Sequence, residues 1–167
     1  MEILTFAFAD DGDIPNSHLP LILYRGALAA SGDVSSAFEA RFRQSGWGRL
    51  WRNSVFPFHH YHSNTHEVLG IGAGSVMLRL GGEVNGTTLE ANTGDALLIP
   101  AGVGHKRLSD ATGLTVVGAY PAGAPAYDLW REGAEEKDRI RVRIAGVPLP
   151  ETDPIGGKSG AVFEAWK

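Results

Sequence analysis

The feature that most constrains this chain is a cluster of histidines in the stretch HHYHSNTHE at 59–67. Four imidazoles and one carboxylate fall within nine residues, which no packing requirement explains. Phe56, Phe58, His60 and His62 alternate along the sequence. A strand sends alternate side chains to the same face, so an extended segment would place two imidazoles on one face, beside two aromatic rings. The pattern therefore predicts a polar site built on a strand.

Two further residues complete a set of metal-binding side chains. The turn-prone segment 63–65, SNT, allows the chain to bend so that Glu67 returns toward the histidines. The segment 100–105, PAGVGH, ends a Pro/Gly turn with His105. Three imidazoles and one carboxylate are a usual ligand set for a divalent transition metal. The residues alone also allow a simpler interpretation, a surface histidine cluster on a loop.

The spacing of these residues resembles the paired motifs of the cupin superfamily. The first motif is a His-x-His pair, then a carboxylate after four intervening residues, then a glycine at position 74. The second motif places Gly94, Pro100 and Gly102 ahead of the last histidine. Both motifs match in residue type, interval and order, and together they cover residues 56–105. The resemblance implies a small jelly-roll β-barrel.

Carried over by position, the resemblance implies His60, His62, Glu67 and His105 as metal ligands. It implies a divalent transition metal, one of Fe, Mn, Ni or Zn. Two positions depart from the cupin pattern, because Ser54 stands where a glycine is frequent and Ser109 stands where an asparagine is frequent. These positions serve turn and strand geometry, so the departures affect element boundaries more than the ligand set.

Length and composition exclude several classes of protein. With 167 residues and 43% hydrophobic residues, the chain is expected to form one domain over 1–167. Its metal-binding core would lie at about 50–120, with a C-terminal helix and tail at about 128–167. The formal net charge of −4 argues against nucleic acid as a partner. The absence of cysteine excludes disulfides and thiolate metal sites.

Targeting signals are also missing from the sequence. The N-terminal residues have no basic segment, and no run of eighteen apolar residues exists, so we expect no signal peptide and no membrane partner. A cytoplasmic protein is the default expectation. Because open sheets have edges that must be covered, and cupins commonly form dimers, we expect a homodimer in which residues 2–8 cover an edge.

The chain reads as many short strands with frequent turns, which predicts an antiparallel sandwich or barrel. A helix is expected near 33–46 and another at 134–145, because apolar residues there recur at helical spacing. The predicted fold class is all-β with minor α, a cupin-type antiparallel jelly-roll β-barrel with one helix before and one after the barrel motifs. The further expected segments are strands at 2–8, 21–25, 96–99 and 114–120, two strands within 67–80 that are separated by the glycine-containing segment 72–74, and a loop at 10–20.

Two other groups of residues complete the expectations. By strand parity, His59 and His66 should point away from the site, as solvated or hydrogen-bonded surface imidazoles; the alternative is that they support the metal ligands from behind. Phe163 and Trp166 should dock the C-terminal tail on the barrel, because exposing large apolar side chains is unfavourable. If the tail docks near the open end, residues 151–167 are a candidate lid for the site.

The predicted function is that of a metal-dependent cupin protein, a metalloenzyme acting on a small anionic or chelating organic substrate. An oxygenase, a decarboxylase and an isomerase all fit. The alternative is a non-catalytic, metal-dependent module that binds a small ligand. Phe56 and Phe58 are expected to line a partly apolar cavity. No catalytic residue is assigned, although Tyr120, Tyr127 and Arg79 are candidates.

Overall fold

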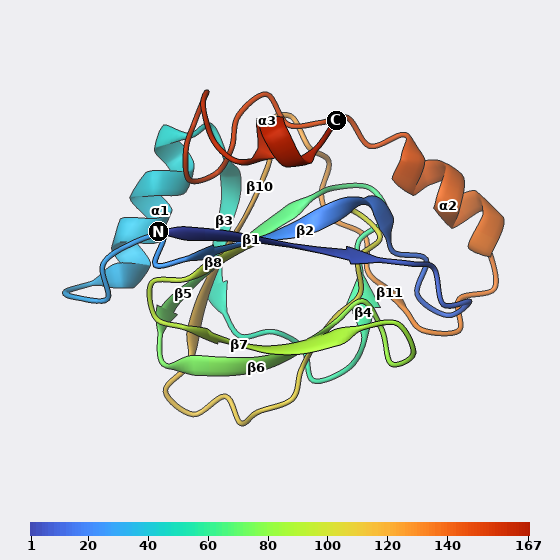
Figure 1. The fold of residues 1–167 in the computed structure, drawn as a ribbon, viewed down its shortest axis with the longest axis horizontal. Helices are drawn as coiled ribbons and strands as arrows, with labels where there is room; N and C mark the ends of the chain where they lie inside the picture. Colours follow the sequence, from blue (N-terminus) through green and yellow to red (C-terminus); the bar gives the residue numbers. More distant parts are fainter.

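The structure, a computed structural model that describes residues 1–167, consists of two antiparallel sheets with helices outside them (Figure 1). One sheet has six strands in the order β1-β2-β8-β5-β10-β3, and the other has five in the order β11-β4-β9-β6-β7. The strands are β1 (Glu2–Phe8), β2 (Ser17–Arg25), β3 (Gly48–Asn53), β4 (His60–Tyr61), β5 (Glu67–Ala73), β6 (Ser75–Leu80), β7 (Thr87–Asn92), β8 (Ala96–Ile99), β9 (His105–Arg107), β10 (Thr115–Tyr120) and β11 (Trp130–Arg131). The helices are α1 (Val34–Gln44), α2 (Lys137–Ala145) and α3 (Val162–Ala165).

The predicted fold class is confirmed in that the chain is mostly β with minor α and its strands form two antiparallel sheets. The strand pairing leaves the barrel open, because no ladder joins the two sheets. One helix precedes the barrel motifs as expected, and α2 and the short α3 follow them. No helix of the structure has the length and apolar character needed to cross a membrane.

The six-stranded sheet is covered on both faces. Along β2, Leu21 and Leu23 pack in the interior between the sheets, whereas Ile22 and Tyr24 pack on the outer face. All four residues of β8 are buried, as their continuous apolar run predicts. The alternation of strand side chains thus produces two apolar layers, one between the sheets and one under α1 and α3.

Helix α1 forms the main cover of the outer face (Figure 1). It begins after Asp33, whose carboxylate accepts a hydrogen bond from the Ser36 N–H at 3.0 Å and so caps the helix N-terminus. Its Phe38 ring lies so close to β5 that a Cβ at Gly70 would be 2.6 Å from the ring. Glycine at that position therefore sets the distance between the helix and the sheet.

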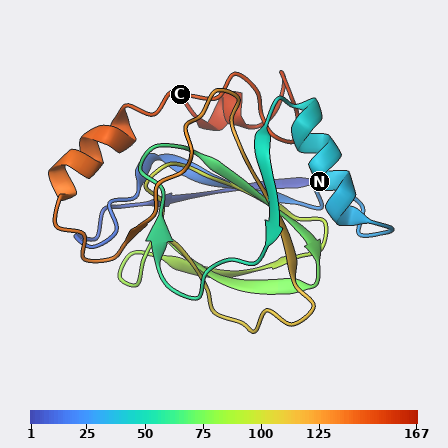
Figure 2. The ribbon, with the colours of Figure 1, turned by 180° about the vertical axis from the view of Figure 1, so that it is seen from behind.

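Three predicted boundaries are wrong. Strand β2 begins at Ser17, inside the expected loop at 10–20, because Ser17 pairs with Phe8 after a bulge in β1. Helix α2 begins at Lys137 rather than at 134, and no side chain caps its N-terminus. Residues 54–59 form an irregular loop between β3 and β4 rather than a strand, and Figure 2 shows that loop from behind.

The C-terminal tail is held by a buried carboxylate. Asp153, fully buried, accepts hydrogen bonds from the N–H groups of Ile155, Gly156 and Val162 and from the Tyr24 hydroxyl at 2.6–3.0 Å. Trp166 is 3% exposed, and its indole N–H donates to the Pro20 carbonyl at 2.8 Å. The expected docking of the tail is correct for Trp166. It is wrong for Phe163, which is 40% exposed.

Candidate metal centre

A cavity of about 440 Å³ opens into the structure beside the candidate ligands. Its lining residues come from β3, β4, β5, β9, β10 and three loops: Arg49, Trp51, Arg52, Asn53, Ser54, Val55, Phe56, Pro57, His60, His62, Glu67, Leu69, His105, Tyr120, Ala126 and Tyr127. The four residues that the cupin resemblance singled out all line this one cavity. The cavity is therefore the place where their chemistry must be considered.

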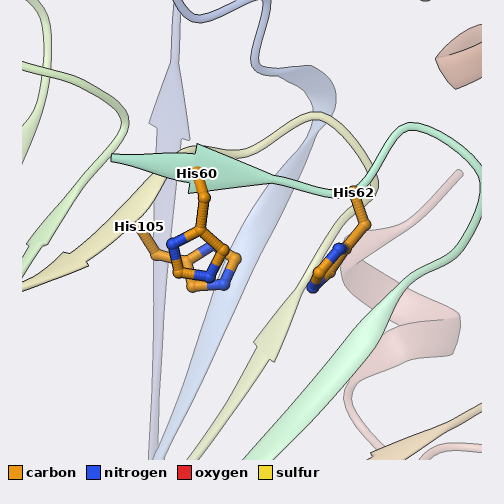
Figure 3. Close-up of side chains that lie close together, drawn as sticks. All are labelled: His60, His62 and His105. Atoms are coloured by element: carbon orange, nitrogen blue, oxygen red, sulfur yellow. The ribbon is translucent and has the colours of Figure 1, made fainter. Parts of the chain in front are cut away.

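Strand pairing brings three histidines together (Figure 3). His60 of β4 is the antiparallel partner of His105 of β9, and their ring centroids are 4.0 Å apart. His62 follows β4, and one ring nitrogen from each of the three histidines lies within 4.8 Å of the others. All three are at most 6% exposed. Three buried imidazoles in such proximity need a chemical reason, because burying polar groups is costly.

Backbone carbonyls fix the orientation and the tautomer of each ring. The Nδ1 atoms of His60, His62 and His105 lie 3.1, 2.5 and 3.1 Å from the carbonyl oxygens of Phe58, Asp128 and Val103. A carbonyl oxygen can only accept, so each Nδ1 carries the proton. In the neutral rings, each Nε2 is then left with a free lone pair. This is the tautomer that metal-binding histidines use when they coordinate through Nε2.

Glu67 enters the site from the opposite sheet. It is the first residue of β5, and strand alternation directs it inward with Leu69. Its Oε2 lies 3.3 Å from His62 Nε2 and 3.4 Å from His105 Nε2. Its Oε1 accepts a hydrogen bond of 2.7 Å from the Tyr120 hydroxyl. One carboxylate oxygen is therefore anchored, and the other faces the imidazoles.

Trp51 extends this anchor. Its indole N–H donates to the Tyr120 hydroxyl at 2.9 Å, so the hydroxyl accepts from Trp51 and donates to Glu67. Gly118 of β10 makes room for the indole, since a Cβ there would lie 2.0 Å from the ring. No sequence pattern predicts this contact between Trp51 and Tyr120. The signal was the pair of Trp51 with a facing glycine, which only strand register reveals.

The distances fit a shared cation better than hydrogen bonds. If the Nε2 atoms carried protons, His62 and His105 would be imidazolium ions, and charged N–H to carboxylate bonds are usually about 2.7–2.9 Å long. The observed 3.3 and 3.4 Å are longer. Two donors that each lie about 2.0–2.2 Å from one zinc-like ion are separated by roughly 3.0–3.5 Å. The residues present thus fit a divalent metal.

Burial and the interactions with Glu67 determine which side chains of the site are charged. Burial lowers the pKa of His60, and the neighbouring His105 lowers it further, so this ring stays neutral. Burial opposes protonation of His62 too, but the Glu67 carboxylate outweighs it and raises the pKa of His62. Burial also disfavours the charged form of Glu67, yet His62 and His105 reverse the effect and lower the pKa of Glu67. The carboxylate is therefore the anion of the site.

A loop after β10 holds His62 from outside. Asp128, whose backbone carbonyl contacts His62, accepts hydrogen bonds through its carboxylate from the Ser63 N–H at 2.7 Å, from the Ser63 hydroxyl and from the Trp130 indole N–H at 2.9 Å. Its neighbour Tyr127 packs its ring 4.8 Å from the ring of His62. These contacts position His62, and no sequence pattern predicts them.

Of the three polar residues that were candidates for catalysis, two line the cavity and one does not. Tyr120 and Tyr127 line the cavity and stack on each other with ring centroids 5.5 Å apart. Arg79 is not part of the cavity lining, because its guanidinium donates to the carbonyls of Gly82 and Glu83. The sequence therefore predicted two of three polar candidates in the right place.

Of the two phenylalanines that precede the histidines, only one lines the cavity. Phe56 lines the cavity and meets the His60 ring edge-on at 5.1 Å. Phe58 stacks on Phe56 with ring centroids 5.0 Å apart, but it does not line the cavity. The expected apolar wall is thus formed by only one of the two rings.

His59 and His66 point away from the histidine group, as strand parity predicts, but both are buried and so are not surface imidazoles. His59 Nε2 lies 2.7 Å from a Glu83 carboxylate oxygen. His66 Nδ1 accepts from the Ala101 N–H at 3.0 Å, and its ring packs against Trp166. Both rings serve the packing of the shell around the site.

The expected lid is not seen in this arrangement. None of the residues 151–167 lines the cavity, and Trp166 packs on the outer face of the six-stranded sheet. The tail therefore lies on the far side of that sheet from the candidate metal centre. The residues after β10 that do reach the cavity are Ala126 and Tyr127.

Comparison with known proteins gives one strong match. The chain is 43% identical over 166 residues to the uncharacterized protein YjlB of Bacillus subtilis (strain 168), covering 99% of this chain and 97% of that protein. No protein-family model matches. Among solved structures, an 11S globulin from Wrightia tinctoria matches with a TM-score of 0.40 and 16% identity, over 49% of this chain and 22% of the globulin.

A second solved structure gives a match of similar quality. It is QdtA, a sugar 3,4-ketoisomerase from Thermoanaerobacterium thermosaccharolyticum, with a TM-score of 0.40 and 18% identity over 59% of this chain and 74% of QdtA. This chain therefore spans only about a fifth of the globulin but most of QdtA. Neither likeness bears on activity, because both TM-scores and both identities are low.

Proposed function

We propose that this chain, which belongs to the family of Bacillus subtilis YjlB, binds a divalent transition metal through His60, His62, Glu67 and His105. The observation that carries the proposal is the commitment of three Nδ1 atoms to backbone carbonyls, with Glu67 facing two of the Nε2 atoms. A surface cluster of histidines would have no need of such fixed tautomers. The four residues also suit iron, manganese, nickel or zinc, since imidazole and carboxylate bind all of them.

The substrate we propose is a small organic anion or chelator. One carboxylate against a divalent ion leaves a net positive centre, which attracts negative charge. A cavity of about 440 Å³ holds a small molecule, and Phe56 and Leu69 give it apolar walls. When bound, the metal supplies a Lewis acid or, for iron or manganese, a redox centre. Tyr120 and Asp128 hold Glu67 and His62 in place.

A metalloenzyme of the oxygenase, decarboxylase or isomerase type is the function we favour. A non-catalytic binding module is the second candidate, and one observation supports it. Apart from the four proposed ligands, the cavity lining contains no histidine and no carboxylate that could move a proton. Its other titratable groups are two arginines and two tyrosines, and Tyr120 is already engaged between Trp51 and Glu67.

Metal analysis tests the proposal directly. Protein purified without a histidine tag should contain about one transition metal ion per chain by elemental analysis. His105→Ala should lose the ion, whereas His18→Ala should keep it, because His18 is exposed and outside the cavity. Full metal content in His105→Ala would refute the ligand assignment.

Incubation of the metal-loaded protein with small carboxylic acids separates the two functions. A metalloenzyme should convert at least one acid, measured by mass spectrometry, with oxygen uptake if the reaction is an oxygenation. A binding module should bind an acid by calorimetry and return it unchanged. Conversion that persists in His105→Ala would exclude the proposed centre as its cause.

We further propose that the chain forms one domain and associates as a cytoplasmic homodimer through β1. This strand lies at one end of the six-stranded sheet, so one of its edges has no partner strand. Ile3 on this strand is 39% exposed, and unpaired edges favour association. Light scattering should give twice the mass of the chain, and Thr5→Pro, at the middle of β1, should give a monomer.

A further inference from the structure

We propose that Arg49 determines substrate choice by binding a second anionic group of a small organic dianion whose other end reaches the candidate metal centre. This inference rests on the proposed function, because it assigns the remote end of the same ligand. It narrows the substrate class from anions in general to molecules with two separated acid groups.

The backbone at Arg49 is the first observation. Its φ is +51°, in the left-handed region that side chains with a Cβ rarely adopt. Thirteen glycines occupy positive φ in this chain, and the one other residue to do so is Asn16. Asparagine tolerates this region, and the side chain of Asn16 is buried and hydrogen-bonded. Arginine does not share asparagine's tolerance of this region, and the side chain of Arg49 has no hydrogen bond to hold it there. A glycine is present, but one position earlier, at Gly48.

The strain has a local origin in the register of β3. Gly48 pairs with Tyr120 and Trp51 pairs with Gly118, so Arg49 and Leu50 of β3 oppose one residue of β10. This is a β-bulge, and bulges near active sites re-aim a side chain. Leu50 packs on the outer face under α1, whereas Arg49 and Trp51 line the cavity. A glycine would form the same bulge without strain, so the presence of arginine here supports a role for its side chain.

The charge environment is the second observation. Arg49 makes no ion pair and no side-chain hydrogen bond. The other arginine at the cavity, Arg52, is neutralised, since its Nε lies 2.7 Å from a Glu39 carboxylate oxygen on α1. The sole carboxylate of the cavity lining is Glu67, which is tied to Tyr120 and the imidazoles. Arg49 is thus the cavity guanidinium that is free to bind an anion.

The chemistry of the guanidinium indicates the ligand. Its planar fork binds carboxylate or phosphate groups in a bidentate manner, with strength and direction that a lysine lacks. A ligand that contacts both Arg49 and the metal must carry acid or chelating oxygens at one end and an anionic group at the other. Its length should match the span between the two, so affinity should depend on chain length.

The test uses the manganese-loaded protein and calorimetric titration with linear dicarboxylates from oxalate to adipate. For each dicarboxylate, the monocarboxylate of equal length is the reference. Wild-type protein should prefer one dicarboxylate by about tenfold or more over its reference. Arg49→Gly should lose this preference and its dependence on length, and Arg49→Lys should retain part of it. Arg139→Gln, which removes one charge from an exposed site on α2, should behave as wild type.

A second series identifies the remote anion. In phosphoglycolate and its longer homologues a phosphate replaces the remote carboxylate. Tighter binding of this series by wild-type protein, lost in Arg49→Gly, would assign phosphate rather than carboxylate to Arg49. Whether the remote anion is a carboxylate or a phosphate, the Arg49 guanidinium is the group that binds it.

Two measurements separate this inference from the proposed function. Arg49→Gly should keep wild-type manganese content and should melt at the same or a higher temperature, because glycine relieves the strain. Equal dicarboxylate preference in Arg49→Gly and wild type would overturn the inference while leaving the metal site intact. If wild-type protein takes up no metal, the proposed function fails. In that case the role of Arg49 is tested with metal-free protein. Wild-type protein should bind these anions, and Arg49→Gly should not.

Discussion

Glu67 and Asp153 are both almost completely buried carboxylates, but their surroundings differ. Asp153 accepts hydrogen bonds from three backbone N–H groups and from the Tyr24 hydroxyl. Glu67 accepts one hydrogen bond, from Tyr120, and its second oxygen faces imidazole nitrogens at 3.3 and 3.4 Å. A buried charge that neutral donors satisfy fully is part of the architecture. A buried charge that faces lone pairs is suited to a cation.

Replacing each carboxylate by its amide should separate the two roles, and the largest effect is expected at Asp153. In Asp153→Asn the amide N–H₂ would face backbone N–H donors, and the negative charge that they stabilise would be gone. We expect a loss of roughly 3–5 kcal/mol in the free energy of unfolding, measured by urea denaturation. Metal content per folded chain should stay at the wild-type value. A stability loss below about 1 kcal/mol would show that the Asp153 network is not structural.

Glu67→Gln should show the opposite pattern. The amide oxygen can still accept from Tyr120, and the amide N–H₂ can donate to the Nε2 lone pairs of His62 and His105. The unfolding free energy in the presence of a chelator should therefore change by less than about 1 kcal/mol. Metal affinity, measured by competition with a chromogenic chelator, should fall by about 100-fold or more. A large stability loss with unchanged metal affinity would make Glu67 a second structural carboxylate.

The two tyrosine hydroxyls allow the same comparison with a smaller perturbation. Tyr120→Phe removes the donor that fixes Oε1 of Glu67, and metal affinity should fall about tenfold, as for other groups that orient a ligand. Tyr24→Phe removes the equivalent donor from Asp153. It should leave metal affinity unchanged and should cost about 1–2 kcal/mol of stability. Equal effects of both variants on metal binding would indicate a general loss of packing rather than a specific anchor.

The sequence predicts the local parts of the site well and the non-local parts poorly. Motif spacing singled out His60, His62, Glu67 and His105, and the structure places them in one cavity. His59 and His66, expected to point away from the site, do not line the cavity. Their burial was not predictable, because the covering groups, Glu83 for His59 and Trp166 for His66, are distant in sequence.

The residues that support the site depend on register and on long connections. Asp128 contacts Ser63, which lies 65 residues earlier in the sequence, and no local sequence pattern predicts that contact. Arg49 became visible only when the pairing of β3 with β10 showed a bulge. The role of Asp153 is not predictable either, since the sequence does not show that Tyr24 and two turns of backbone converge on it. Side-chain chemistry can be inferred locally, whereas its positioning requires the fold.

The smallest expected effect is on the alkaline limit of stability, and it comes from the hydroxyl that donates to Asp153. Burial, reinforced by the charge of Asp153, raises the pKa of Tyr24 above its usual value near 10. Between pH 10 and the raised pKa, the unfolded chain loses this proton and the folded chain keeps it. The folded state then binds more protons, so its stability falls as the pH rises.

For one such group the fall is about 1.4 kcal/mol per pH unit above 10. Tyr24→Phe has no proton to lose at this position, so its stability should fall less steeply. Urea denaturation at pH 9 and pH 11 should show that wild-type protein loses about 1.4 kcal/mol more than the variant between the two. Parallel losses in both proteins would mean that Tyr24 ionises normally. The Asp153 site would then be less closed than its hydrogen bonds imply, and its contrast with Glu67 would weaken.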